Sequence, residues 1–163
     1  MGTDLGRNAV AIANGEMGVT EHPPGSNSGP RVNEYLAAVQ LGPGYAWCSA
    51  FASWCIQRAA VALGIAPAFR YSGGALALWS RNAPRSIAPQ ALTPDDLPCV
   101  VVWNHGGGLG HVGLCVGLDQ AAGKLQTIEG NSDANGSRTG GQVVAHSDRR
   151  LDDPKLMGFL RIE

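Results

Sequence analysis

The first half of the chain carries apolar residues at three- and four-residue intervals, the spacing of helices with one buried face. The pattern predicts a helix over Leu5–Met17, a short one opened by Pro30, a third from about Cys48 to Leu63, and a short fourth after Ser72. Proline is tolerated in a first helical turn because its missing N–H would have no partner there. Gly64 is placed to end the third helix.

The second half of the chain changes to the patterns that are typical of strands. Strands are predicted over residues 99–103, 111–116, 124–129, 141–146 and 157–162. The glycine-rich stretch over residues 104–110 is a candidate connection between the first two strands. Helices followed by an antiparallel sheet indicate an α+β fold, with N-terminal helices packed on a C-terminal sheet. We expect one domain over residues 1–163.

Composition and charge narrow the class of protein. Hydrophobic residues make up 44% of the chain, charged residues make up 15%, and the formal net charge is -1. This balance argues against a protein that binds nucleic acid by charge. No apolar run approaches the roughly 20 residues that cross a bilayer, and the N-terminus lacks the pattern of a signal peptide. We expect synthesis in the cytoplasm, no membrane insertion, and any export by a route without a cleaved signal.

The stretch YAWCSAFASWC, residues 45–55, holds two of the four cysteines. Cys48 lies at a predicted helix start, where free N–H groups and the helix dipole favour a thiolate that can attack a carbonyl. Free cysteine is also commonly a small buried hydrophobe, and position alone favours that alternative. Cys55 lies about two helical turns further on, roughly 10 Å away, and is expected to be a core residue.

Three downstream residues could complete a cysteine site. His111 opens a predicted strand after the glycine-rich connection and could serve as base and acid. Glu129 ends a predicted strand and could orient an imidazole, and Asn131 could do the same or fix a turn. Each residue taken alone has an ordinary structural interpretation. Their order along the chain, after Cys48, favours a shared catalytic site over separate structural roles.

These motifs together resemble the CHAP domain family, the cysteine- and histidine-dependent amidohydrolases and peptidases related to NlpC-type and papain-like folds. The matching pieces are Ala46-Trp47-Cys48-Ser49-Ala50-Phe51, Gly110-His111-Val112-Gly113 and Glu129-Gly130-Asn131. The segment over residues 18–36 also resembles the lead-in of bacterial and prophage members, so the similarity spans about residues 5–162. The resemblance implies a papain-like fold with Cys48 as nucleophile, His111 as general base and acid, Glu129 orienting the imidazole, and Asn131 as a fourth polar group.

The resemblance also implies a substrate. Family members cleave peptidoglycan, as N-acetylmuramoyl-L-alanine amidases or as endopeptidases, including the D,L type, within the stem peptide or cross-bridge. Tyr45 and Trp47 are candidates for lining the substrate groove, with packing as the alternative for each. No cofactor is expected. Some members bind calcium ahead of the cysteine, but no Asp or Glu lies between Glu34 and Cys48, so we expect no metal there.

Two biological settings suit a compact catalytic domain of this kind. One is a prophage-type lysin released with the help of a holin. The other is an antibacterial effector delivered into a rival's periplasm, which implies a cognate immunity protein. We expect a monomer in both settings. Three rival interpretations stay open: a non-catalytic binding module, an amidase acting on a small peptide conjugate, and a metal site of Cys115, His111 and His105, whose spacing matches no common zinc pattern.

The spacing of the strands also predicts a contact between two cysteines. If the first two predicted strands form a hairpin centred on Gly107, Cys99 and Cys115 lie opposite each other, close to disulfide reach. A cytoplasmic origin favours free thiols. In the same hairpin Gly113 shares a face with His111, where it would let the Cys48 helix approach closely.

Overall fold

The computed structural model describes residues 2–163, and its helices precede its sheet along the chain. The helices are α1 (Asp4–Gly15), α2 (Pro30–Ala37), α3 (Cys48–Leu63) and α4 (Ala75–Arg81). Gly64 ends α3 in the left-handed conformation that favours glycine. All four predicted helices are confirmed. Over the described residues, no helix is long and apolar enough to span a bilayer.

In the part of the chain that the structure describes, six strands form one antiparallel sheet in the order β1-β6-β2-β3-β4-β5. The strands are β1 (Ser86–Ile87), β2 (Cys99–Gly106), β3 (Leu109–Asp119), β4 (Lys124–Ser132), β5 (Gln142–Arg150) and β6 (Leu156–Arg161). One-turn 3-10 helices at Ala83–Arg85, Pro89–Ala91 and Pro94–Asp96 connect α4 to β2 around β1. The α+β prediction is confirmed. Strand β1 was not predicted, because two residues are too few to show an alternating pattern.

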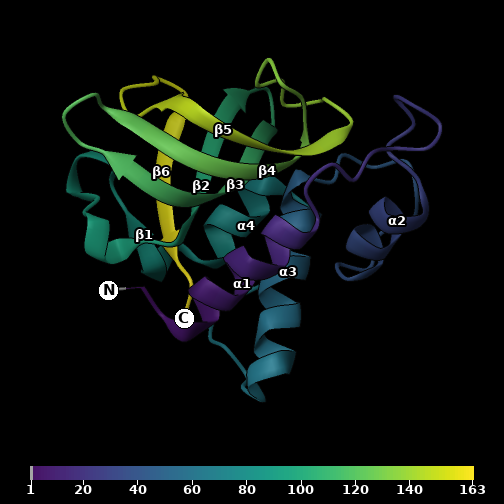
Figure 1. Cartoon of the computed structure of the whole chain (residues 1–163), viewed down its shortest axis with the longest axis horizontal. Helices are drawn as coiled ribbons and strands as arrows, with labels where there is room; N and C mark the ends of the chain where they lie inside the picture. Colours follow the sequence, from purple (N-terminus) through teal and green to yellow (C-terminus); the bar gives the residue numbers. More distant parts are fainter. Residues whose placement is uncertain (1) are drawn as a thin grey trace.

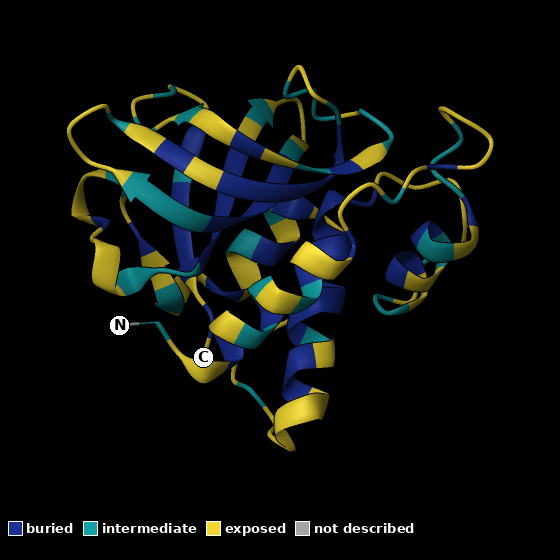
Figure 2. Cartoon of the chain, in the orientation of Figure 1, coloured by how far each residue is buried: buried dark blue, intermediate teal, exposed yellow. Residues whose placement is uncertain are grey.

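Helices α1, α3 and α4 cover one face of the sheet, as Figure 1 shows. The core on that face includes Phe51 and Ile56 of α3 and Val102 and Leu114 of the sheet. A second apolar cluster, which includes Val101 and Phe159, covers the opposite face. Strands that are buried on both faces have no polar side to alternate with. This explains the uninterrupted apolar run at the start of β2, which is buried throughout (Figure 2).

Strands β2 and β3 form the predicted hairpin. Cys99 pairs with Cys115, as the spacing predicted, and all four cysteines are free. The prediction for Gly113 is wrong, because Gly113 does not face α3. A Cβ atom at Gly113 would lie 2.7 Å from Cγ of Glu129, so this glycine makes room for the Glu129 side chain instead.

The close approach of α3 to the sheet occurs at Gly130. A Cβ atom there would lie 2.8 Å from Cβ and Cγ of Phe51 and 2.9 Å from the ring of Trp47. The pairing of β4 with β5 also shifts register between Glu129 and Ser132. Such a bulge turns side chains away from the regular alternation of a strand. The bulge and its glycine therefore place the first turn of α3 directly against the end of β4.

Candidate active site

Cys48 is the first residue of α3, and only 6% of its surface is exposed. The backbone N–H groups of Val112 and Ser49 donate toward its sulfur. Burial alone raises the pKa of the Cys48 thiol. The charge and hydrogen bond of His111, together with the two N–H groups, outweigh burial and hold that pKa below its ordinary value. The surroundings of Cys48 therefore favour the thiolate.

His111 lies on β3 with 2% of its surface exposed. Its Nε2 is 2.8 Å from Oε2 of Glu129. Its Nδ1 makes no conventional hydrogen bond, so this is the nitrogen left to face the thiol of Cys48. Burial lowers the pKa of the imidazole, but the negative charges of Cys48 and Glu129 outweigh it and raise the pKa to about 9. The geometry and charges favour a thiolate–imidazolium pair.

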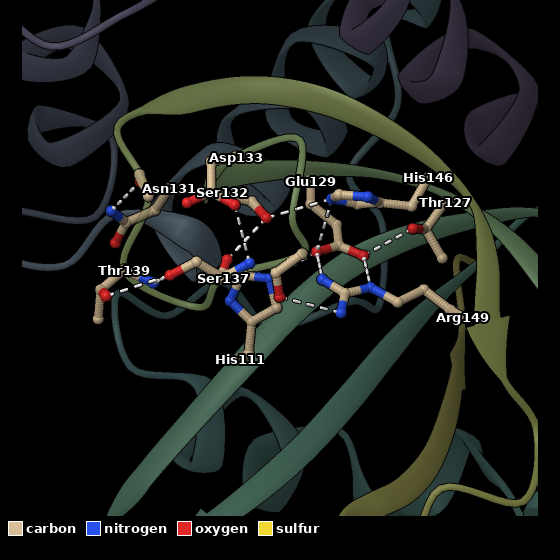
Figure 3. Close-up of polar contacts among 12 residues, drawn as sticks. His111, Thr127, Glu129, Asn131, Ser132, Asp133, Ser137, Thr139, His146 and Arg149 are labelled. Atoms are coloured by element: carbon tan, nitrogen blue, oxygen red, sulfur yellow. Dashed lines mark hydrogen bonds and ion pairs between the residues drawn. The ribbon is translucent and has the colours of Figure 1, made fainter.

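Glu129 lies on β4 and is completely buried, and its carboxylate accepts hydrogen bonds from two further residues (Figure 3). Thr127 Oγ1 donates to Oε1 at 2.6 Å. Arg149 of β5 donates from Nε to Oε1 at 2.8 Å and from Nη2 to Oε2. Burial raises the pKa of the carboxyl, but the hydrogen bonds and charges of His111 and Arg149 outweigh it and lower the pKa to about 2. Glu129 is thus an ionised acceptor that can orient the imidazole.

Thr127 and Arg149 were not predicted from the sequence. Both lie on strands, and nothing in their neighbourhood along the chain separates them from ordinary strand positions. Arg149 is followed by Arg150, which pairs with exposed Asp152, so the local charge pattern resembles a solvated edge. Only the pairing of β4 with β5 brings Arg149 to the carboxylate.

Asn131 occupies a different position from the other three predicted residues. Its φ is +55°, a left-handed conformation that asparagine tolerates better than most residues. Its Oδ1 accepts the backbone N–H of Trp47 at 2.9 Å, and its Nδ2 donates to the carbonyl of Gly140 at 2.8 Å. Its side chain therefore joins the residue that precedes Cys48 to the β4–β5 connection, and neither of these hydrogen bonds goes to His111.

The two residues predicted to line the substrate groove, Tyr45 and Trp47, differ in their exposure to solvent. Trp47 has no exposed surface; its indole N–H donates to Oε1 of Glu21 at 2.9 Å, and its ring stacks on Tyr35. The packing alternative therefore describes Trp47. Tyr45 is 56% exposed and remains available to a substrate. Buried Glu21 was not predicted, because a carboxylate in a loop rich in turn residues is normally solvated.

The remaining predictions concern core packing and metal binding. Cys55 is completely buried in the middle of α3, and burial raises the pKa of its thiol, in keeping with a core residue. Within residues 2–163, no three side chains of His, Cys, Asp or Glu form a group that could hold a metal ion. Cys115, His111 and His105 therefore do not assemble the ligand set that the metal interpretation needs.

Comparison with protein-family models gives one match. The model of the CHAP domain matches residues 40–131, which is more than half of the chain and extends from the loop before Cys48 to Asn131. Searches of curated proteins and of solved structures gave no match. The match includes the residues around Cys48, His111 and Glu129, the same residues that meet at the start of α3. The chain belongs to the CHAP domain family, and with it to the cysteine- and histidine-dependent amidohydrolases and peptidases.

Proposed function

We propose that this protein is a peptidoglycan hydrolase that cleaves an amide bond of the stem peptide through a thioester on Cys48. The observation that carries the proposal is the buried sequence of contacts from Cys48 to His111 to Glu129 at the first turn of α3. Membership of the CHAP family supports the substrate class, because peptidoglycan is the usual substrate of that family.

The first step is attack on the amide carbonyl. The Cys48 thiolate forms a C–S bond, and the carbonyl oxygen takes up the negative charge. The backbone N–H of Cys48 has no partner within the helix, because the first turn has no preceding carbonyls to bond. It can therefore donate to the oxyanion. Only a group that is aimed at the developing charge stabilises the transition state more than the substrate.

His111 then moves two protons in turn. Its Nδ1–H is donated to the departing amine as the C–N bond breaks, which leaves the thioester on Cys48. The neutral imidazole next takes a proton from water, whose oxygen attacks the thioester carbon. The C–S bond breaks and the thiolate returns, paired again with the imidazolium. Glu129 holds Nε2 throughout, so that Nδ1 keeps facing the reacting atoms.

We propose that the enzyme acts in the periplasm or cell wall, as an antibacterial effector delivered by a contact-dependent secretion system. An effector of this kind requires an immunity protein in the producing cell, and the Cys48 site is the natural place for such an inhibitor to bind. A prophage-type lysin released with a holin is the other setting. The neighbouring genes separate them, since a holin gene marks a lysin and a gene for a small exported inhibitor marks an effector.

Mass spectrometry of purified peptidoglycan after digestion tests the proposal and identifies the bond. We expect the wild-type protein and a Cys55→Ala control to release fragments with a new stem-peptide terminus, and a Cys48→Ala variant to release none. Intact sacculi after prolonged digestion by folded wild-type protein would reject the proposal. Retained binding to those sacculi would indicate the binding module, and cleavage of a small peptide amide would indicate the amidase.

A further inference from the structure

The carboxylate of Glu129 accepts hydrogen bonds from more than the catalytic imidazole. His111 Nε2 lies 2.8 Å from Oε2, and Thr127 Oγ1 donates a hydrogen bond to Oε1 at 2.6 Å. The guanidinium of Arg149 spans both oxygens, with Nε on Oε1 at 2.8 Å and Nη2 on Oε2. A planar fork that bonds both oxygens fixes the rotation of a carboxylate as well as its position.

Arg149 is itself held in place from two further directions. Its Nη1 donates to the carbonyl of Gly136 at 3.1 Å, and its guanidinium lies over the ring of Trp103 with 5.1 Å to the centroid. Trp103 pairs with His111 across the β2–β3 hairpin, and the two rings are 5.6 Å apart. Arg149 therefore contacts both the carboxylate that orients the imidazole and the aromatic ring that packs beside it.

Arg149 also balances the charge of the buried site. The thiolate of Cys48 and the carboxylate of Glu129 are negative, the imidazolium of His111 is positive, and these three groups sum to one negative charge. The guanidinium brings that sum to zero. A buried group of charges without its counter-ion is strongly unfavourable, and the usual relief is a change in protonation.

Other titratable groups near His111 do not replace this charge. His146 of β5 lies 3.8 Å from Glu129, and burial lowers the pKa of its imidazole. His105 of β2 also has its pKa lowered, first by burial and then by neighbouring positive charges. Burial therefore disfavours the charged form of both imidazoles. The remaining charges that act on Arg149, those of Asp148 and Asp153, are negative.

We propose that Arg149 is a positioning residue of the Cys48 site, whose fork fixes Glu129 and whose charge keeps the thiolate–imidazolium pair ionised. Arg149 acts through Glu129 and touches neither the substrate nor the sulfur. The inference rests on the proposed cysteine chemistry. It does not depend on peptidoglycan being the substrate.

The test measures the rate at which iodoacetamide alkylates Cys48 between pH 5 and pH 10, by peptide mass, because this rate follows the thiolate and needs no substrate. Arg149→Met removes charge and fork, and we expect alkylation at pH 6 to fall about threefold or more, with the whole profile displaced to higher pH. Arg149→Lys keeps the charge without the fork, so its profile should stay near wild type while hydrolysis falls about tenfold. Arg150→Met, an exposed neighbour on the same strand, should change neither.

A folded Arg149→Met protein with the wild-type alkylation profile would overturn the proposal. If that variant does not fold, Arg149→Lys decides, since wild-type hydrolysis by the lysine variant would show that the fork is not needed. The two proposals fail in different ways. If the wild-type protein shows no Cys48 thiolate below the ordinary pKa of cysteine, the proposed cysteine chemistry is wrong. If the wild-type protein shows this thiolate and the Arg149 variants match it, the proposed role of Arg149 is wrong.

Discussion

Cys48 and Cys55 lie seven residues apart on one helix, yet their surroundings drive the acidity of the two thiols in opposite directions. At Cys48 an imidazole and two N–H groups outweigh the effect of burial. At Cys55 burial and the nearby carboxylate of Glu16 raise the pKa, and the positive charge of Arg31 is too weak to offset them. Chemical reactivity here follows the neighbours that the fold supplies.

This difference predicts selective modification. One equivalent of iodoacetamide at pH 7 should label Cys48 and leave Cys55, Cys99 and Cys115 unlabelled, because a thiolate reacts and these three side chains have no exposed surface. Peptide mapping by mass spectrometry measures the four sites together. Equal labelling of Cys48 and Cys55 in folded protein would contradict the assignment of the nucleophile.

The imidazole of His111 predicts a pH dependence. Its pKa is about 9 in the folded protein and about 6.5 in an unfolded chain, so the folded state binds this proton more tightly. The stabilisation is fully present below about pH 6.5 and is lost as pH rises through about 9. The pKa of the Cys48 thiol is shifted the opposite way, which offsets this loss, so we expect hydrolysis to fall near pH 9 while the melting temperature changes little. Hydrolysis that stays constant between pH 7 and pH 10 would contradict the assignment of the imidazolium as the proton donor.

Glu129→Gln should reduce both activity and stability. The amide can no longer stabilise the imidazolium, and we expect kcat to fall roughly a hundredfold. It also leaves the half-buried guanidinium of Arg149 without its carboxylate, which should cost about 2 kcal/mol in the free energy of unfolding. Glu34→Gln is the matched control, because Glu34 is half exposed in its pair with Arg31 and should change stability by less than about 0.5 kcal/mol. Urea unfolding of both variants gives the comparison.

At the scale of elements, the end of β4 determines where α3 begins. Gly130 has no side chain, so α3 can pack closely against it. Asn131 accepts a hydrogen bond from the N–H of Trp47 and so fixes the residue before Cys48. Glu129 belongs to the same three-residue segment and accepts from His111. The motif Glu-Gly-Asn therefore sets the imidazole of His111 and the thiol of Cys48 relative to each other through one bulge.

Gly130→Ala should separate these two elements. The added methyl group would lie within 2.9 Å of the side chains of Phe51 and Trp47, so α3 must move away from the sheet. We expect a loss of about 1–3 kcal/mol in the free energy of unfolding and a larger proportional loss of activity. Gly42→Ala is the control, since nothing lies within 4 Å of its added Cβ. Equal stability of the two variants in urea unfolding would contradict the close approach.

At the scale of the whole molecule, repeating patterns along the chain predicted the helices and most strands. The strand order and part of the candidate site depend on contacts between distant segments, which such patterns do not reveal. Helical spacing predicted α1 to α4, and β-prone runs predicted five strands. The position of β6 between β1 and β2 could not be predicted, because register and strand order arise from tertiary packing. Cys48, His111 and Glu129 carry chemistry in their residue types. Nothing in the sequence around Arg149 points to the site, and only the pairing of β4 with β5 brings it to Glu129.

The rate at which purified peptidoglycan releases new amino groups, compared between wild type and Cys48→Ala, tests the central claim most directly. Removing the sulfur leaves no nucleophile, so the variant should be slower by about a thousandfold or more while its melting temperature stays close to that of wild type. A folded Cys48→Ala protein that releases amino groups at a rate near that of the wild type would contradict the account.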